Sequence, residues 1–469
     1  MKKVLSVAAI AAIVGCAGTA SAVDFSVHGD LNHRFMVYTD HAEFLVGDTF
    51  EKGKALLDGG ASDSWGEIKY RLWADMSSDD GNVKGVYALE LGALEFGQSG
   101  SVGKSVGGSY SGDGVNIETR WAYLDMQIPG VANKLRMKTG LQPFNLNPYF
   151  WKETVMGVNF DGQTDNFGYY VGWERPYRVG VKYDDNGTSD VDAFIGQFNV
   201  KPMDNTKVGA FVSYQTSSPD QNGVIDARKW QIKKMNADVG LDIYTLGLTG
   251  ELKGDGFFVN GDFIYQGGSI DQATYIDQND VESAPGINDF DVSSYFFHAD
   301  VGTKVGATKL TATYWYSSGD DDPTDDELNA YLSTDVDMTA SMVIMEGTAV
   351  DDDYFTERPY ILDKGLHLFK LAADHKVNDK LKIGSAFLYM MTAEDITYTN
   401  DDTGMAYGND EVGYELNGYV KYNLYPDVVL DLRAAYLFAG DAMDYFEENL
   451  NGSSDEDIFV STASIRFKF

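Results

Sequence analysis

The sequence predicts an all-β membrane protein, a transmembrane antiparallel up-and-down β-barrel of 16–18 strands with short periplasmic turns and long extracellular loops. Three observations predict it. Segments of about ten residues alternate apolar and polar positions along the whole chain, no segment after the first residues is apolar enough for a spanning helix, and the connections alternate in length. A barrel needs apolar side chains only at alternate positions, so a mean hydropathy of -0.27 is compatible with crossing a membrane.

Eighteen segments carry this alternation, an even number, as a closed barrel with both termini on one side requires. The segment 155–160 is the weakest, so 16 strands remain the alternative. The segment 167–183 is interpreted as one long strand with an irregularity at Arg175 and Pro176, because its other odd positions are apolar. The expected strands are 24–38, 65–76, 83–96, 117–128, 134–142, 155–160, 167–183, 191–200, 208–214, 239–252, 257–265, 295–303, 310–316, 366–374, 381–390, 412–422, 428–438 and 458–469.

Short and long connections alternate between these strands. The short ones hold the Gly, Asn, Asp and Pro residues that tight turns need. Short periplasmic turns and long outer loops are typical of outer-membrane barrels, and soluble β-sandwiches do not sort their loops in this way. The short connections are 77–82, 129–133, 161–166, 201–207, 253–256, 304–309, 375–380 and 423–427; the long ones are 42–63, 97–115, 143–154, 184–190, 215–238, 266–294, 317–365, 391–411 and 439–457.

The first residues have the form of a signal peptide. Lys2 and Lys3 precede a short apolar run, and Ala20-Ser21-Ala22 offers the small side chains that signal peptidase requires. We therefore expect a signal peptide over 1–22 and one barrel domain over 23–469, exported to the cell outer membrane. Lipidation of Cys16 is the alternative. Cleavage after Ala22 removes the one cysteine, which excludes a disulfide, a thiolate metal site and covalently bound haem.

Charged residues lie opposite the apolar faces of the expected strands. In 134–142, for example, Leu135 and Met137 lie on one face, whereas Arg136 and Lys138 lie on the other. A packed core could not hold so many charges, but a barrel of this size encloses water. The residues expected to line the lumen are Lys69, Arg71, Asp75, Glu90, Arg136, Lys138, Arg178, Lys182, Asp262, Asp300, Asp431 and Arg433.

The final segment, 458–469, alternates cleanly and ends on the aromatic residue Phe469. In this respect the chain resembles the outer-membrane porins of Gram-negative bacteria, in which such a strand is the assembly signal. The resemblance implies a channel for passive diffusion of ions and small hydrophilic solutes, surrounded by outer-membrane lipid. It also implies a homotrimer and recognition of Phe469 by the barrel-assembly machinery. It implies no cofactor.

The segment after Lys138 also resembles a porin strand, the one that leads into the constriction loop. The resemblance implies that 143–154 folds into the pore, where Arg136 and Lys138 would face acidic groups and create a transverse field. An aromatic cluster at the barrel rim is the alternative, because this segment contains Phe144, Tyr149, Phe150 and Trp151.

The stretch 317–365 is the most acidic of the chain. We interpret it as a solvated surface loop that repels its like-charged surroundings. Binding of a divalent cation is the alternative, because hard cations prefer clustered carboxylates, although the spacing of an EF-hand loop is absent. The candidate ligands are Asp320, Asp321, Asp322, Asp325 and Asp326.

The net charge of -36 opposes binding to nucleic acid and predicts a preference for cations. The sequence contains no P-loop and no H-E-x-x-H motif, and we expect no enzymatic activity. Two alternatives remain: an outer-membrane barrel enzyme, and a barrel sleeve around an outer-membrane cytochrome, which would need a haem-bearing partner. A ligand-gated importer is disfavoured because no plug domain precedes the first expected strand.

Overall fold

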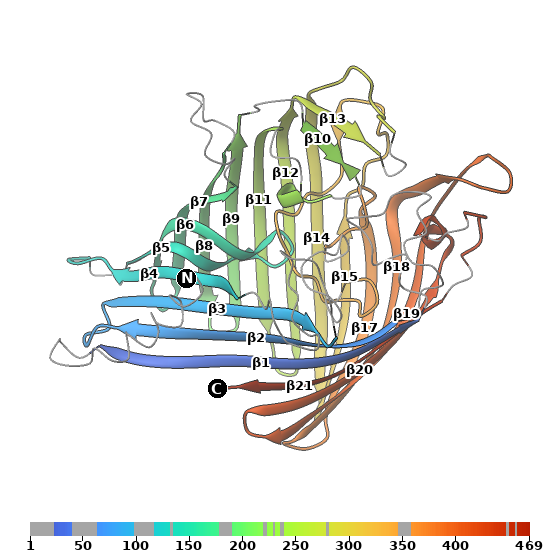
Figure 1. Ribbon diagram of the computed structural model, residues 1–469. Helices are drawn as coiled ribbons and strands as arrows, with labels where there is room; N and C mark the ends of the chain where they lie inside the picture. Colours follow the sequence, from blue (N-terminus) through green and yellow to red (C-terminus); the bar gives the residue numbers. More distant parts are fainter. Residues whose placement is uncertain are drawn as a thin grey trace.

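The computed structural model describes residues 23–39, 63–97, 117–131, 135–177, 190–218, 223–227, 230–234, 239–277, 281–345, 358–446, 450–454 and 457–469. Within these residues, 18 strands form one closed antiparallel barrel (Figure 1). Each strand pairs with its neighbours in the chain, as in an up-and-down barrel. No helix among the described residues is long and apolar enough to cross a membrane.

The barrel strands match the expected segments one for one. They are β1 (Asp24–Thr39), β2 (Asp63–Ser77), β3 (Val83–Glu95), β4 (Glu118–Gln127), β5 (Arg136–Asn147), β6 (Trp151–Gln163), β7 (Phe167–Tyr177), β8 (Val191–Met203), β9 (Thr206–Ser217), β11 (Gly240–Lys253), β12 (Phe257–Asp271), β14 (Phe290–Val305), β15 (Thr308–Ser317), β17 (Leu366–Lys376), β18 (Leu381–Thr399), β19 (Ala406–Tyr425), β20 (Val428–Ala439) and β21 (Ile458–Lys468).

Closure depends on the pairing of the first strand with the last. β1 pairs with β21 from Asp30 opposite Lys468 to Thr39 opposite Phe459. Phe469 continues this pairing, because its backbone exchanges hydrogen bonds of 2.9 and 3.1 Å with Gly29. A closed ring leaves no unpaired strand edge in lipid, where each unsatisfied backbone group is costly.

The two faces of the wall differ as the alternation predicts. Large apolar side chains point outward and are exposed, such as Val171, Phe194 and Leu248. Residues at the alternate positions of the strands, such as Glu174 and Ser213, point inward and are buried. This inside–outside contrast is the reverse of a soluble protein and fits a barrel surrounded by lipid.

The structure resolves the alternative left open by the sequence. The weakest expected strand is real, since β6 pairs with both β5 and β7, and the barrel has 18 strands rather than 16. The expected irregularity in β7 is also present, because the register with β8 shifts between Glu174 and Tyr177. The part of the expected strand beyond Tyr177 lies outside the described residues.

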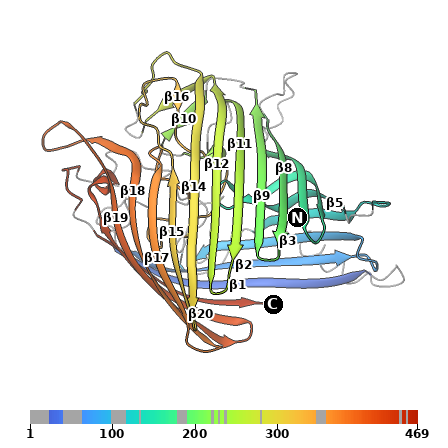
Figure 2. The same cartoon turned by 180° about the vertical axis from the view of Figure 1, so that it is seen from behind.

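Smaller elements lie at the end of the barrel where the long connections are found. β10 (Gly223–Asp226) and β13 (Ala273–Ile276) form a parallel pair (Figure 1). β16 (Glu327–Leu328) pairs with β14 (Figure 2). The described residues at this end also form two short 3₁₀ helices, η2 (Ile232–Lys234) and η3 (Asp441–Phe446). The opposite end has tight turns, for example two residues between β14 and β15.

Candidate functional site

Charged side chains lie on the face of the barrel wall opposite to the exposed apolar residues. Register with neighbouring strands places Lys69, Arg71 and Asp75 on one face of β2, opposite to the exposed side chain of Leu72. The same criterion puts Glu90, Arg136, Lys138, Asp262, Asp300, Asp431 and Arg433 on the inner face of their strands. Arg178 and Lys182 lie outside the described residues.

Three clusters on β1–β4 and β19–β21 contain more bases than acids. Glu90 contacts Arg71, Lys69 at 3.4 Å and Arg120 at 2.7 Å. Asp30 is shared by Arg466 and Lys468, and Asp431 is shared by Lys421 and Arg433. Most of these side chains keep a fifth or more of their surface exposed, as expected beside a water-filled passage.

The upper part of the β5–β6 hairpin leaves the barrel wall. β5 pairs with β4 only as far as Leu141, and β6 pairs with β7 only as far as Gly157. The two strands nevertheless stay paired with each other up to Asn147 and Trp151. Figure 1 shows this end of the hairpin, in teal, reaching toward β12 and β14. The expected long connection 143–154 is therefore mostly strand, closed by the tight turn 148–150.

The hairpin tip docks on the opposite inner wall. The Asn147 side-chain amide donates to an Asp262 carboxylate oxygen at 2.8 Å, and the Asp262 carboxylate also contacts His298 at 2.9 Å. The Tyr149 ring packs on Phe296 and His298, with centroids 4.7 Å apart in both cases. The aromatic residues of this segment thus lie inside the barrel and do not form a cluster at its rim.

The acidic connection between β15 and β17 also folds inward, which contradicts its interpretation as a solvated surface loop. Its described residues include fully buried aromatic, aliphatic and polar side chains, among them Tyr331, Leu332 and Ser333. The reason is in the sequence: apolar residues around Ala330–Leu332 and Met338–Met345 interrupt the acidic runs, and they bury themselves against the wall and the hairpin tip.

Hydrogen bonds hold this connection at several points of the barrel interior. Glu415 of β19 accepts from the hydroxyl of Ser341 and from the backbone amides of Met342 and Val343. On the other side of the lumen, Gln266 of β12 donates to the Leu332 carbonyl at 2.9 Å. We call residues 318–345 and 358–365 the inner loop.

The inner loop and the hairpin tip also bind each other. The Thr334 amide donates to the Phe150 carbonyl, and the Lys152 amide donates to the Asp335 carbonyl, both at 2.8 Å. Burial raises the pKa of Asp337 and the charge of Glu153 adds to the rise, whereas Lys152 and Lys69 oppose it. Asp337 of the inner loop therefore lies within electrostatic reach of Lys69. We call the inner face of β1–β4 and β19–β21, which carries the three base-rich clusters, the base-rich wall.

The five candidate cation ligands do not converge. Asp320 is buried near Tyr275 and Asp363, whereas Asp321, Asp322 and Asp326 are exposed. Asp322 and Asp325 accept hydrogen bonds from Thr324 and Glu327 within their own turn. Among the residues that the structure places, no group of three or more His, Cys, Asp and Glu side chains could hold a metal ion.

Burial strongly changes the acidity of Asp320. It raises the pKa of this carboxyl from 3.8 to about 7, and the nearby charge of Asp363 adds to the rise. The Lys364 ammonium, which donates to the Asp320 carbonyl at 2.7 Å, opposes it only partly. Asp320 therefore titrates near neutral pH inside the inner loop.

Sequence reasoning found the inner-wall charges but not their partners in the inward segments. Asp262, His298 and Glu415 all stand at positions that the alternation of the sequence assigns to the lumen-facing side. Nothing in the alternation indicated that loop backbone amides, such as those of Met342 and Val343, would be their partners.

Comparisons with known proteins bear on the fold. No protein-family model matches the chain, and no curated protein matches it. Among solved structures, it is similar to Pseudomonas aeruginosa OccK9 (OpdG), with a TM-score of 0.52, 12% identity, and coverage of 95% of this chain and 98% of the other. It is also similar to Acinetobacter baumannii OccAB4, with a TM-score of 0.51, 10% identity, and coverage of 96% and 100%.

A third similar structure is a BenF-like porin from Pseudomonas fluorescens Pf-5, with a TM-score of 0.51, 11% identity, and coverage of 96% of this chain and 100% of the other. Identities this low bear on the fold alone. The chain thus has the fold of Gram-negative outer-membrane porins, as the final strand and the alternation predicted.

Proposed function

We propose that the chain forms a water-filled channel in the outer membrane for passive diffusion of ions and small hydrophilic solutes, and that it has no catalytic activity. The observation that carries the proposal is the contrast between the two faces of the wall. The outer face is apolar, while the inner face holds ion pairs that remain partly exposed. Such charges are tolerated inside a membrane only where water reaches them.

In this proposal, the hairpin tip and the inner loop together set the width of the passage. Both occupy the interior between β6 and β19, so a solute would pass between them and the base-rich wall of β19–β21 and β1–β4. Glu153 of the hairpin lies 4.0 Å from Arg120 of that wall. A polar solute would therefore meet opposite charges on its two sides, which favours hydrated and dipolar molecules.

We also propose a modest preference for cations at low salt. The net charge of -36 becomes -38 when Lys2 and Lys3 are removed with the signal peptide, and this charge enriches cations near the channel mouths. The base-rich wall opposes the preference within the lumen. Because the Debye length falls to about 3 Å at 1 M salt, the preference should fade as salt is added.

Assembly into a homotrimer remains part of the proposal. A polar pair on the outer face supports it: His33 of β1 and Tyr70 of β2 point outward and bond each other. Polar groups are unfavourable against lipid, so this region suits contact with a neighbouring copy. We further propose that the signal peptide directs export and that Phe469 is recognised during barrel assembly.

Swelling of proteoliposomes tests the diffusion channel. The refolded mature chain should let vesicles swell in arabinose and much more slowly in the tetrasaccharide stachyose, since the inward segments restrict size. Glu415→Ala removes the acceptor for Ser341, Met342 and Val343, so it should raise the stachyose rate several-fold. No swelling in arabinose by a correctly folded barrel would contradict the proposal.

A further inference from the structure

The wall of the barrel separates between β6 and β7. Their last pair is Gly157 with Glu174, yet β6 continues to Trp151 and β7 continues to Tyr177. Beyond that pair, β6 continues its ladder with β5 and bonds to Asp335 of the inner loop, while β7 pairs with β8. The departure of the hairpin into the lumen therefore leaves a gap in the wall beside it.

A cavity of about 350 Å³ occupies this gap. Its lining combines the two faces of the wall, which an intact sheet would keep apart. Met156 is an outward-facing side chain, 53% exposed, whereas Gln215 and Leu241 point into the barrel and are buried. Thr334 and Asp335 of the inner loop form part of the far side. The cavity thus crosses the plane of the wall.

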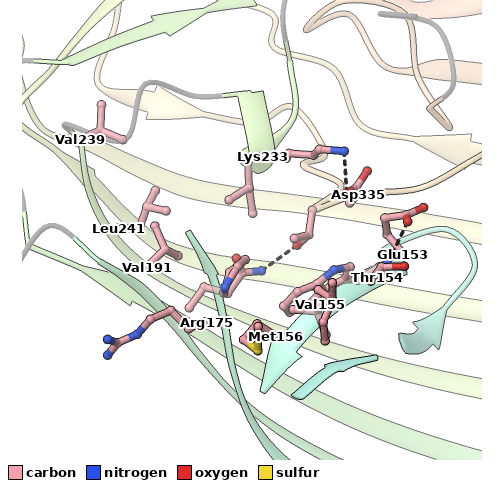
Figure 3. Close-up of a pocket in the computed structure, with 16 residues that line it drawn as sticks. Glu153, Thr154, Val155, Met156, Arg175, Val191, Lys233, Val239, Leu241 and Asp335 are labelled. Atoms are coloured by element: carbon pink, nitrogen blue, oxygen red, sulfur yellow. Dashed lines mark hydrogen bonds and ion pairs between the residues drawn. The ribbon is translucent and has the colours of Figure 1, made fainter. Parts of the chain in front are cut away.

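The surface around the gap is that of the apolar outer face. Phe160 of β6 lies below it, and Val171 and Trp173 of β7 lie beside it, all with exposed side chains. Arg175 stands at its edge, but its guanidinium bonds Asp190 and Asp192 and points away from the cavity in Figure 3. A molecule dissolved in the membrane could therefore approach the gap without crossing a layer of charge.

The walls of the cavity fit a small molecule that is largely apolar. Trp151, Val155, Ile232 and Val239 line it, together with Leu241. Apart from Arg175 at the mouth, its charged groups lie on the side of the inner loop, where Lys233 pairs with Asp335 at 2.9 Å near Glu153 (Figure 3). The Gln215 amide donates to Thr334 at 2.7 Å. The volume lies in the range of sites for small organic ligands.

We propose that this gap is a lateral portal, through which small and largely apolar solutes with one polar end pass from the outer face of the barrel into the cavity beside the hairpin. The route is separate from the axial passage between the inward segments and the base-rich wall. It would accept solutes that dissolve in lipid and enter a hydrated channel poorly. The two routes are independent, so the failure of the portal proposal would leave the diffusion-channel proposal standing, and the reverse also holds.

Fluorine NMR of the refolded chain in lipid nanodiscs, labelled with 5-fluorotryptophan, tests the portal. The probe is the nitroxide TEMPO, a small ring with one polar end, whose unpaired electron broadens nearby resonances. Trp151, 2% exposed, lies in the cavity, whereas Trp230 and Trp315 are equally buried and lie elsewhere. Trp151→Phe, Trp230→Phe and Trp315→Phe assign the three signals.

TEMPO should broaden the Trp151 signal several-fold more than those of Trp230 and Trp315. Met156→Trp places bulk at the mouth and should abolish that difference, while Phe160→Trp, on the same face of the same strand below the gap, should preserve it. If TEMPO broadens the Trp151 signal no more than the Trp230 and Trp315 signals in the unmodified chain, the portal is overturned, whether or not Met156→Trp folds. Broadening of Trp151 by doxyl-labelled phosphatidylcholine, with none by TEMPO, would assign the cavity to a lipid chain and also overturn it.

Discussion

The side-chain amide of Asn147 donates a 2.8 Å hydrogen bond to the carboxylate of Asp262, joining the tip of the β5–β6 hairpin to β12 across the barrel interior. The two residues are separated by five intervening strands of the wall. This contact, together with the packing of Tyr149 on Phe296 and His298, holds the hairpin inside the barrel rather than at its rim.

Removing this contact should loosen the constriction. Asn147→Ala deletes a hydrogen bond to a charged acceptor, which typically contributes about 1.5–3 kcal/mol. In single-channel recordings, we expect more frequent transitions between conductance levels and a higher mean conductance. Asn260→Ala is the matched control. Asn260 lies on β12, the strand of Asp262, and its side chain is the next one on the inner face of that strand. Identical traces for the two variants and the unmodified chain would show that the contact does not hold the hairpin.

The charge balance at Glu90 should control ion selectivity within the lumen. Glu90→Gln removes the carboxylate that Lys69, Arg71 and Arg120 share, so their positive charge becomes less compensated. We expect the reversal potential in a KCl gradient to shift by several millivolts toward anion permeation. Asp379→Asn removes one negative charge from a periplasmic turn and should leave the potential nearly unchanged. A shift of equal size in both variants would place the control of selectivity outside the base-rich wall.

The inner loop should respond to pH through Asp320. The pKa of this group is raised from 3.8 to about 7 in the folded loop, mainly by burial, so the folded loop binds a proton more tightly than the released loop does. Docking of the loop is therefore most stable below about pH 4, weakens as pH rises to about 7, and changes little above that. The difference corresponds to roughly 4 kcal/mol, at 1.36 kcal/mol per pKa unit.

The measurement is limited proteolysis of the inner loop between pH 5 and pH 8 in a refolded barrel. Cleavage should increase with pH in the unmodified chain, and Asp320→Asn should cleave slowly at both values. Asp322→Asn, an exposed neighbour, is the control and should keep the dependence on pH. A dependence that survives Asp320→Asn unchanged would assign it to another group.

Closure of the barrel should be sensitive to the space between Gly29 and Phe469. A Cβ atom at Gly29 would overlap the Phe469 ring, whereas a Cβ at Gly85, on the outer face of β3, would meet only Met76 at 3.7 Å. Gly29→Val should therefore destabilise the folded barrel by about 1–3 kcal/mol, as overpacking does, and Gly85→Val much less. The folded fraction after urea titration, measured by heat-modifiable electrophoretic mobility, distinguishes the two. Equal midpoints would exclude a closing role for this contact.

Alternation predicted the wall well because period-two burial is a local property of each strand. It identified both faces of β5, where Arg136 and Lys138 point inward, and it located even the short segment around Val155. It ended β5 too early, because Phe144 and Leu146 continue the strand but bury themselves inside the barrel rather than facing lipid.

The contents of the barrel were not predictable in the same way. Acidic runs near Asp320 indicated a solvated loop, but Tyr331, Leu332 and their apolar neighbours outweigh that signal once the wall and the hairpin tip offer them a surface to pack on. Contacts such as Gln215 with Thr334 join residues far apart in sequence. No local pattern encodes them, since they depend on how the whole barrel closes around the loop.

Conductance of the refolded mature chain in a planar lipid bilayer tests the central claim most directly. An open channel narrowed by two inward segments should give stepwise current increases in KCl, with a unit conductance below that of the Glu415→Ala variant. A barrel that is closed and folded, by heat-modifiable mobility, yet never conducts in either form would contradict the account of a hydrated diffusion channel.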